Sequence, residues 1–199
     1  MIDPSDVTKF DRTDAELEEW WLFSTIVAGK TAQTQARLLE KFLENAANLC
    51  RYDATLEQDI RINRTFSPFQ LIRGLGADLF GCMEVARIGQ YTRLERCWRE
   101  SLSLDLRNDP VEAFEAIHGV GPKTARMFIM HSRPNQRLAA LDTHLLKHLA
   151  AHGHEVPKAT PSSPKKYREL ELAFLELADK AGKTPADYDL EIWKSYARK

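Results

Sequence analysis

The feature that most constrains the fold is a helix-start signal that recurs along the chain, a capping residue followed directly by proline. Proline is favoured at the first helical position, because its fixed φ suits a helix and its missing N–H would have no partner there. The polar residue before it can cap the N–H groups of the first turn. The signal occurs at Ser67-Pro68, Asp109-Pro110, Ser163-Pro164 and Thr184-Pro185. Each pair predicts the start of a helix.

The apolar residues between these signals follow a helical period. One stripe comprises Leu17, Trp20, Trp21, Ser24, Val27 and Ala28, a second Leu38, Leu39, Phe42, Leu43 and Ala46, and a third Leu170, Ala173, Phe174 and Leu177. Alternating runs of β-branched residues and Asn-Gly turns are absent from the sequence. The pattern predicts an all-α fold of short helices.

A chain of 199 residues is suited to one domain or to two small lobes that share a cleft. The segment Glu155–Ser163, EVPKATPSS, is rich in proline and small polar residues. We expect this segment to carry the chain from one lobe to the other.

Composition narrows the class of protein. No apolar run approaches the roughly 20 residues of a membrane helix, and the acidic N-terminal sequence has no signal-peptide core, so we expect a cytoplasmic protein that is not bound to a membrane. The three cysteines, Cys50, Cys82 and Cys97, form no C-x-x-C pair. Neither a zinc site nor an iron–sulfur cluster is therefore predicted, and the cysteines are expected to be ordinary thiols.

The net charge of −1 argues against indiscriminate binding of nucleic acid, but the charge is unevenly spread. The stretch 118–148 has one acid, Asp142, and five basic residues: Lys123, Arg126, Arg133, Arg137 and Lys147. A local basic face of this kind can hold DNA phosphates. Chance clustering on a solvated surface would give the same pattern.

The most informative segment begins with a helix predicted from Asp109 to Ile117, followed by the turn His118-Gly119-Val120-Gly121 and a second helix from Pro122 to about His131. Two glycines at this spacing allow a tight turn and close approach of another backbone. The unpaired N–H groups at the start of the second helix would form an anion site for a DNA phosphate.

Lys123 lies in the first turn of the second helix, where the helix dipole disfavours a cation. This position should lower the pKa of its ammonium group and favour the nucleophilic amine. Asp142 opens a further helix that runs to about His152 and ends at Gly153. Asp142 can cap that helix and also present its carboxylate to a cleft.

The run I-H-G-V-G-P-K-T-A, followed by L-D-T-H, closely resembles the helix-hairpin-helix and Gly/Pro-Asp signature of the endonuclease III superfamily of DNA glycosylases. The resemblance implies two helical lobes with the active-site cleft between them. It implies a single glycosylase unit over 1–199, with a central lobe of about 30–142 that holds the helix-hairpin-helix at 110–131. The second lobe would combine about 1–29 with 143–199.

The resemblance also implies roles for individual residues. Lys123 takes the place of the catalytic lysine of the bifunctional members, and Asp142 that of the superfamily's aspartate. Phosphate would bind at Gly119, Val120, Gly121, Lys123 and Thr124, often with a monovalent cation at the hairpin, and no other cofactor is implied. The partner would be damaged double-stranded DNA, bound by a monomer associated with the nucleoid. Lys123 would attack C1′ of the sugar and break the strand through a Schiff base.

The C-terminal region decides which lesion is expected. No cysteine follows Cys97, unlike the iron–sulfur members, and the tail D-L-E-I-W-K-S-Y-A-R-K resembles that of the type 2, archaeal-type 8-oxoguanine DNA glycosylases. In that class Trp193 would stack on the flipped base, and Lys199 with its carboxylate would recognise the oxidised purine. Two alternatives stay open: the same chemistry on oxidised pyrimidines, and a helix-hairpin-helix DNA-binding protein without catalysis.

Overall fold

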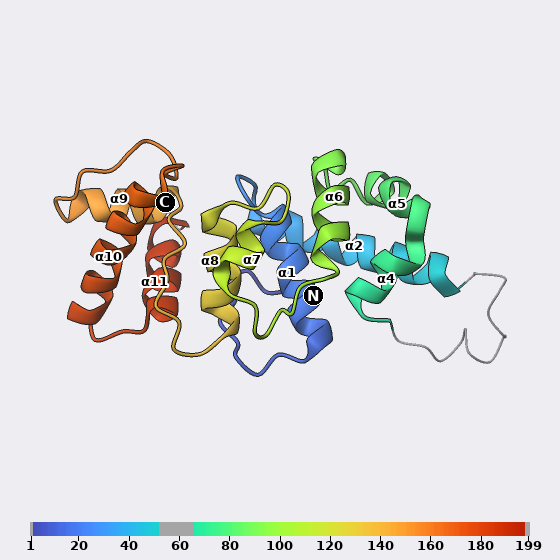
Figure 1. The fold of residues 1–199 in the computed structure, drawn as a ribbon, viewed down its shortest axis with the longest axis horizontal. Coiled ribbons are helices and arrows are strands. Elements are labelled where there is room, and N and C mark those ends of the chain that lie inside the picture. Colours follow the sequence, from blue (N-terminus) through green and yellow to red (C-terminus); the bar gives the residue numbers. More distant parts are fainter. Residues whose placement is uncertain (1, 52–65, 198–199) are drawn as a thin grey trace. The chain divides into compact units, whose positions relative to one another are not determined.

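The computed structural model describes residues 2–51 and 66–197. Helices and turns make up the regular structure of these ranges, in which no strand occurs (Figure 1). The predicted all-α fold is therefore confirmed.

The helices before the hairpin turn are α1 (Asp14–Ile26), α2 (Ala32–Arg51), α4 (Pro68–Leu75), α5 (Leu79–Ala86), α6 (Tyr91–Ser101) and α7 (Val111–Glu115), with a 3₁₀ turn at Gly76–Asp78. The helices after it are α8 (Pro122–Ser132), α9 (Thr143–Ala151), α10 (Pro164–Lys180) and α11 (Pro185–Ala197).

Three of the four predicted helix starts are confirmed. Ser67 caps α4 with a reciprocal bond from its own N–H to Gln70, Ser163 caps α10, and the hydroxyl of Thr184 accepts the Asp187 N–H at 3.2 Å. The fourth prediction was wrong, because α7 starts only after Pro110 and has no side-chain cap.

The Asp109 carboxylate has a different role from the predicted cap. It accepts the Asp105 N–H at 2.8 Å and so stabilises the turn before α7. The helix that follows is only Val111–Glu115, shorter than the predicted 109–117.

The contacts divide the chain into two compact units. We call residues 1–4 and 12–120 the first unit, and residues 5–11 and 121–199 the second unit. This division differs from the expected lobes, which joined residues 1–29 to 143–199. Helix α1 belongs to the first unit because it packs against α2, α4 and α6.

The core of the first unit is rich in aromatic side chains. Helix α1 is buried almost all round from Trp20 to Ile26, rather than along one stripe. Trp21 packs edge-on against Phe114 of α7 at 5.1 Å between ring centroids, and Phe42 of α2 packs against Trp98 of α6 at 5.0 Å. Burial of these large rings contributes to the apolar stabilisation of the unit.

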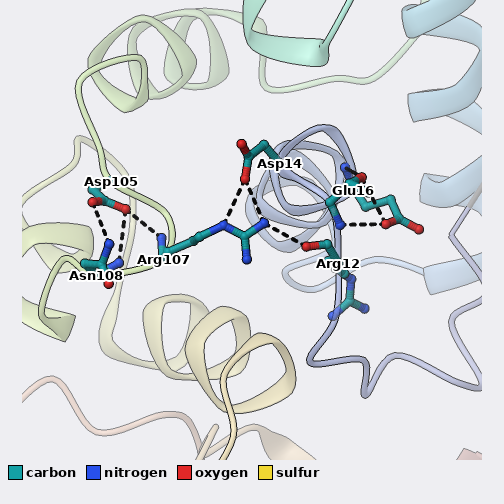
Figure 2. Close-up of polar contacts among 7 residues, drawn as sticks. Arg12, Asp14, Glu16, Asp105, Arg107 and Asn108 are labelled. Atoms are coloured by element: carbon teal, nitrogen blue, oxygen red, sulfur yellow. Dashed lines mark hydrogen bonds and ion pairs between the residues drawn. The ribbon is translucent and has the colours of Figure 1, made fainter.

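A loop arginine ties the start of α1 to the segment before α7 within the first unit. Nε and Nη2 of Arg107 donate to Oδ1 of Asp14 at 2.8 and 2.7 Å, and Nη2 also donates to the Arg12 carbonyl at 2.8 Å (Figure 2). Asp105 fixes the same loop by accepting the N–H groups of Arg107 and Asn108 (Figure 2).

The second unit has its own core, formed by α9, α10 and α11. Leu145, Leu149, Tyr167, Phe174 and Ile192 are among its buried members. The segment 155–163 connects α9 to α10 inside this unit.

Two further expectations concern membranes and thiols. In the described ranges no helix has the length and apolar character needed to cross a membrane. Cys82 and Cys97 are buried thiols and Cys50 is half-buried, as expected from their spacing. Burial raises the pKa of both Cys82 and Cys97 to about 11, so these two are unreactive at neutral pH.

Candidate active site

Lys123 is the second residue of α8, whose N-cap is Gly121. Its side chain is half-buried, and its Nζ lies 3.0 Å from Sδ of Met127, one turn further along the helix. Among the residues that the structure describes, Lys123 forms no direct ion pair. A thioether is a weak hydrogen-bond acceptor, so the contact with Met127 restrains the Lys123 amine only weakly.

Asp142 caps α9, as the sequence predicted. Its Oδ1 accepts the backbone N–H groups of His144 at 2.8 Å and Leu145 at 2.9 Å. Both of these bonds use one oxygen, so Oδ2 is available to the surroundings of Lys123. The cap therefore orients the Asp142 carboxylate and leaves its second oxygen out of the capping bonds.

Helix α10 holds the three residues before Asp142. The hydroxyl of Tyr167 donates to the Ala139 carbonyl at 2.7 Å and accepts the Leu141 N–H at 3.2 Å. The carboxylate of Glu171 accepts the Ala139 N–H at 3.0 Å. These buried bonds determine where the backbone enters α9, and hence where Asp142 lies.

Glu171 is also half of a buried ion pair. It accepts a bond from Nε of Arg126 at 2.8 Å, and the two side chains are only 10% and 12% exposed. The Arg126 guanidinium stacks on the ring of Tyr167 at 4.5 Å from its centroid. Arg126 thus connects α8, which holds Lys123, to the network that positions Asp142.

The pKa values of Lys123 and Asp142 are shifted by burial. Burial lowers the pKa of the Lys123 ammonium below its ordinary value, and the nearby carboxylates of Asp142 and Asp189 only partly oppose this. Burial also raises the pKa of Asp142, against the bond from Leu145 and the charge of Lys123. The lowered pKa agrees with the sequence prediction, but burial is its main cause. Both shifts favour a neutral, nucleophilic amine.

In the hairpin turn, His118–Gly121, only the first of the two glycines has a backbone conformation that favours glycine. Gly119 has a φ of +74°, in the left-handed region that favours glycine, whereas Gly121 has a φ of −102°. The Val120 N–H donates to the Ile117 carbonyl at 3.0 Å, and the Thr124 N–H donates to the Gly121 carbonyl at 3.0 Å.

The N–H groups of the other three predicted phosphate-binding residues are available. In the described parts of the chain, the N–H groups of Gly119, Gly121 and Lys123 have no hydrogen-bond partner. Thr124 is buried, so its side chain does not offer a surface contact. The binding of a phosphate by these three N–H groups stays a prediction.

Helix α6 braces the turn with two residues that the sequence analysis did not single out. Nη1 of Arg93 donates to the Gly119 carbonyl at 2.9 Å, and Nη2 donates to the Thr25 carbonyl at 2.9 Å. The Glu100 carboxylate accepts the His118 N–H at 2.7 Å. These residues lie 18 to 26 positions before their partners, so only the tertiary structure identifies them.

The sequence analysis also missed a carboxylate near Lys123. Asp189 lies on α11, and its Oδ2 is 3.1 Å from Nε2 of the buried His131. Its Oδ1 is buried and has no hydrogen-bond partner among the described residues. Asp189 lies in the D-L-E-I-W run, a signal that could have drawn attention to it.

Part of the chain is similar to curated DNA glycosylases. A protein named 8-oxoguanine DNA glycosylase/AP lyase from a Thermotoga species is 32% identical over 94 residues, which are 44% of this chain and 44% of the relative. Proteins of the same name from Thermotoga petrophila and Thermotoga maritima are 31% identical over the same shares. The chain thus matches less than half of the length of these relatives. No family model and no solved structure matches it.

The two predicted base-pocket residues have different outcomes. Trp193 is half-buried on α11, four residues after Asp189, so both lie on one face of that helix. Ile192 is a member of the core of the second unit, whereas Trp193 is not. Lys199 lies outside the described residues, and its role stays a prediction.

The predicted basic face is smaller than the sequence indicated. Arg126 is buried against Glu171, and Arg137 forms a two-bond ion pair with Asp179 at 3.0 and 2.8 Å. Both acids come from α10, more than 40 residues later in the chain. These two cations are committed to protein carboxylates, so they add little to an attraction for DNA.

Proposed function

We propose that this protein is a bifunctional DNA glycosylase and AP lyase in base excision repair, with Lys123 as the nucleophile and 8-oxoguanine as the excised base. The observation that carries the proposal is the half-buried Lys123 amine beside two carboxylates, with its pKa lowered by burial. A lysine used only for solubility would be exposed and fully charged.

In the proposed reaction, the neutral Lys123 amine attacks C1′ of the damaged nucleotide. The bond from Nζ to C1′ forms, and the glycosidic bond breaks with its electron pair leaving on the base. Asp142 stabilises the positive charge that develops on the sugar, because its Oδ2 is not used by the helix cap. One Nζ proton goes to the departing base. The C1′–O4′ bond then breaks and O4′ takes up the second Nζ proton, which gives the Schiff base. Loss of a C2′ proton from the Schiff base expels the 3′ phosphate and breaks the strand.

The proposal that the base is 8-oxoguanine rests on the similarity to the Thermotoga proteins of that name and on the tail of the chain. The half-buried Trp193 would stack on the flipped base. The N7–H of 8-oxoguanine is a donor that guanine lacks, and a carboxylate in the base pocket would accept it.

The remaining parts of the proposal concern partners. The substrate is damaged double-stranded DNA, bound through the N–H groups of Gly119, Gly121 and Lys123, by a monomer in the cytoplasm that associates with the nucleoid. We propose no cofactor other than a monovalent cation at the hairpin turn. The described residues contain no cluster of three or more metal-ligating side chains.

A trapping experiment tests the proposal. Duplexes with one 8-oxoguanine, one thymine glycol, one abasic site or no lesion are incubated with the protein in borohydride. We expect covalent adducts with the 8-oxoguanine and abasic duplexes, and none with Lys123→Gln. The matched control is Lys165→Gln, which removes an exposed lysine of α10 and should trap normally.

The same panel separates the alternatives. Adducts with thymine glycol but not with 8-oxoguanine would indicate that the substrate is an oxidised pyrimidine. Binding without adducts to any duplex would indicate a DNA-binding protein without catalysis. Undiminished trapping by Lys123→Gln would exclude Lys123 as the nucleophile.

A further inference from the structure

A buried line of polar side chains crosses the second unit from residues 5–11 to α11. His131 is only 1% exposed, and its Nδ1 lies 2.8 Å from the Thr8 hydroxyl while its Nε2 lies 3.1 Å from Oδ2 of Asp189. A hydroxyl that donates to Nδ1 places the ring proton of a neutral imidazole on Nε2, where it donates to the carboxylate. Thr8 and His131 together therefore fix one oxygen of Asp189.

Packing brings Asp189 to the Lys123 side of α11. Ala186, one turn before Asp189, packs with Met130 of α8 and Ala140, and Met127 lies against the same cluster. Met127 is the residue that contacts the Lys123 amine, and Ala140 lies two residues before Asp142. The α11 face that carries Asp189 thus lies against both elements of the candidate site.

The second oxygen of Asp189 has an unmet hydrogen-bonding capacity. Its Oδ1 is buried without a partner in the described part of the chain, although a buried carboxylate oxygen normally has a donor. Lys123 carries three donors and only one of them is used, on the sulfur of Met127. Lys123 therefore has donors that could satisfy this oxygen.

We propose that Asp189 is a second carboxylate of the Lys123 site, a positioning residue that His131 and Thr8 hold in place. This inference rests on the proposed function. Asp142 faces the sugar from the start of α9, whereas Asp189 orients the neutral Lys123 amine by accepting an Nζ–H hydrogen bond at its Oδ1. This bond directs the amine lone pair toward C1′.

The groups that face Lys123 are few, so the pH dependence has a clear sign. Asp142 precedes α9 and Asp189 lies on α11, and both carboxylates act on Lys123. His144 acts on Asp142, and His131 of α8 contacts Asp189. The carboxylate of Asp189 raises the pKa of Lys123 against the effect of burial. Removing that charge should lower the pKa of Lys123 further, so its amine becomes neutral at a lower pH.

The test uses the free protein and needs no DNA. Lys123 is acylated with a trace of acetic anhydride at a series of pH values, and the modified peptide is quantified by mass spectrometry. We expect the midpoint of labelling to move to lower pH in Asp189→Asn and to return toward the wild-type value in Asp189→Glu. The matched control is Asp187→Asn, which removes an exposed acid two residues away and should leave the midpoint unchanged.

A second readout measures the reaction. With a preformed abasic site, Asp189→Asn should trap up to about a hundredfold more slowly at neutral pH, because Lys123 loses its positioning partner. An unchanged labelling midpoint in Asp189→Asn would overturn the proposal. In the wild-type protein, a rapidly exchanging ring proton of His131 in ¹⁵N spectra would also overturn it, and this measurement does not depend on any variant folding.

These outcomes separate the inference from the proposed function. Suppose that Asp189→Asn shifts the midpoint of Lys123 labelling but the wild-type protein traps no DNA. This result would support the place of Asp189 beside Lys123 and exclude the glycosylase activity. Normal trapping by wild type with an unshifted midpoint in Asp189→Asn would retain the activity and reject the role of Asp189.

Discussion

The hairpin turn and the Lys123 site are adjacent in the sequence but are held in place in different ways. Exposed charged side chains of α6 brace the turn through its backbone, from Arg93 to the Gly119 carbonyl and from the His118 N–H to Glu100. The Lys123 site is instead packed against apolar groups from α8, α11 and the segment before Asp142. The difference agrees with the functions that we propose for the two regions. Backbone N–H groups need only the right shape to bind an anion, whereas a reactive amine also needs removal from water.

The largest expected effect is on the chemical step, in Asp142→Asn. The asparagine keeps an oxygen for the N–H groups of His144 and Leu145, so the cap and the fold should survive. Excision should fall by about a hundred- to a thousandfold, because the charge that stabilises the sugar cation is gone. Single-turnover excision and a thermal melt measure the two properties. Near-native excision would reduce Asp142 to a helix cap.

The next effect is on stability, in Glu171→Gln. This change leaves the buried Arg126 without its charged partner, so the free energy of unfolding should fall by about 3 kcal/mol. The control is Asp179→Asn, which breaks the exposed pair with Arg137 and should change stability little. Denaturant unfolding compares the two variants. If both variants lost the same free energy of unfolding, the ion pair of Arg126 and Glu171 would contribute no more to stability than an exposed pair.

The smallest effects concern the turn, where two glycines differ. Gly119→Ala requires a left-handed alanine with its Cβ 2.7 Å from Cγ of Arg93, and should cost about 1–2 kcal/mol in stability. Gly121→Ala has an ordinary φ and no atom within 4 Å of its Cβ, so stability should change by less than about 0.5 kcal/mol.

DNA binding should distinguish Gly121→Ala from the wild type, because a phosphate that approaches the turn would meet the added methyl group. We expect weaker binding to damaged and undamaged duplexes alike, measured by fluorescence anisotropy at fixed salt. A change in lesion preference without a change in overall affinity would show that the turn recognises bases.

Local signals predicted the parts of the structure that depend on neighbouring residues. The caps at Ser67, Ser163 and Asp142 are made within three residues, and the structure confirms them. The failure at Asp109 has the same origin, since its carboxylate has a competing donor four residues earlier. A cap and a loop bond use the same type of residue, and a short sequence window does not tell them apart.

The sequence did not identify the groups that come from distant elements. Glu171, Tyr167, His131 and Asp189 lie 26 to 58 residues from the partners they hold. No periodicity connects positions so far apart, because tertiary packing alone decides which helix faces meet. The basic face was overestimated for the same reason, since the acids that pair with Arg126 and Arg137 lie on α10.

The hydrogen bonds of Tyr167 to Ala139 and Leu141 limit how the candidate site could be transferred to another protein. The recognisable motif ends near the start of α9, but the residue that fixes Asp142 comes from α10, beyond the segment 155–163. A fragment that carried only the hairpin, Lys123 and α9 would keep every residue of the signature and lose the support that aims its carboxylate. Transplanting this chemistry to another helical scaffold therefore requires α10 as well as the motif.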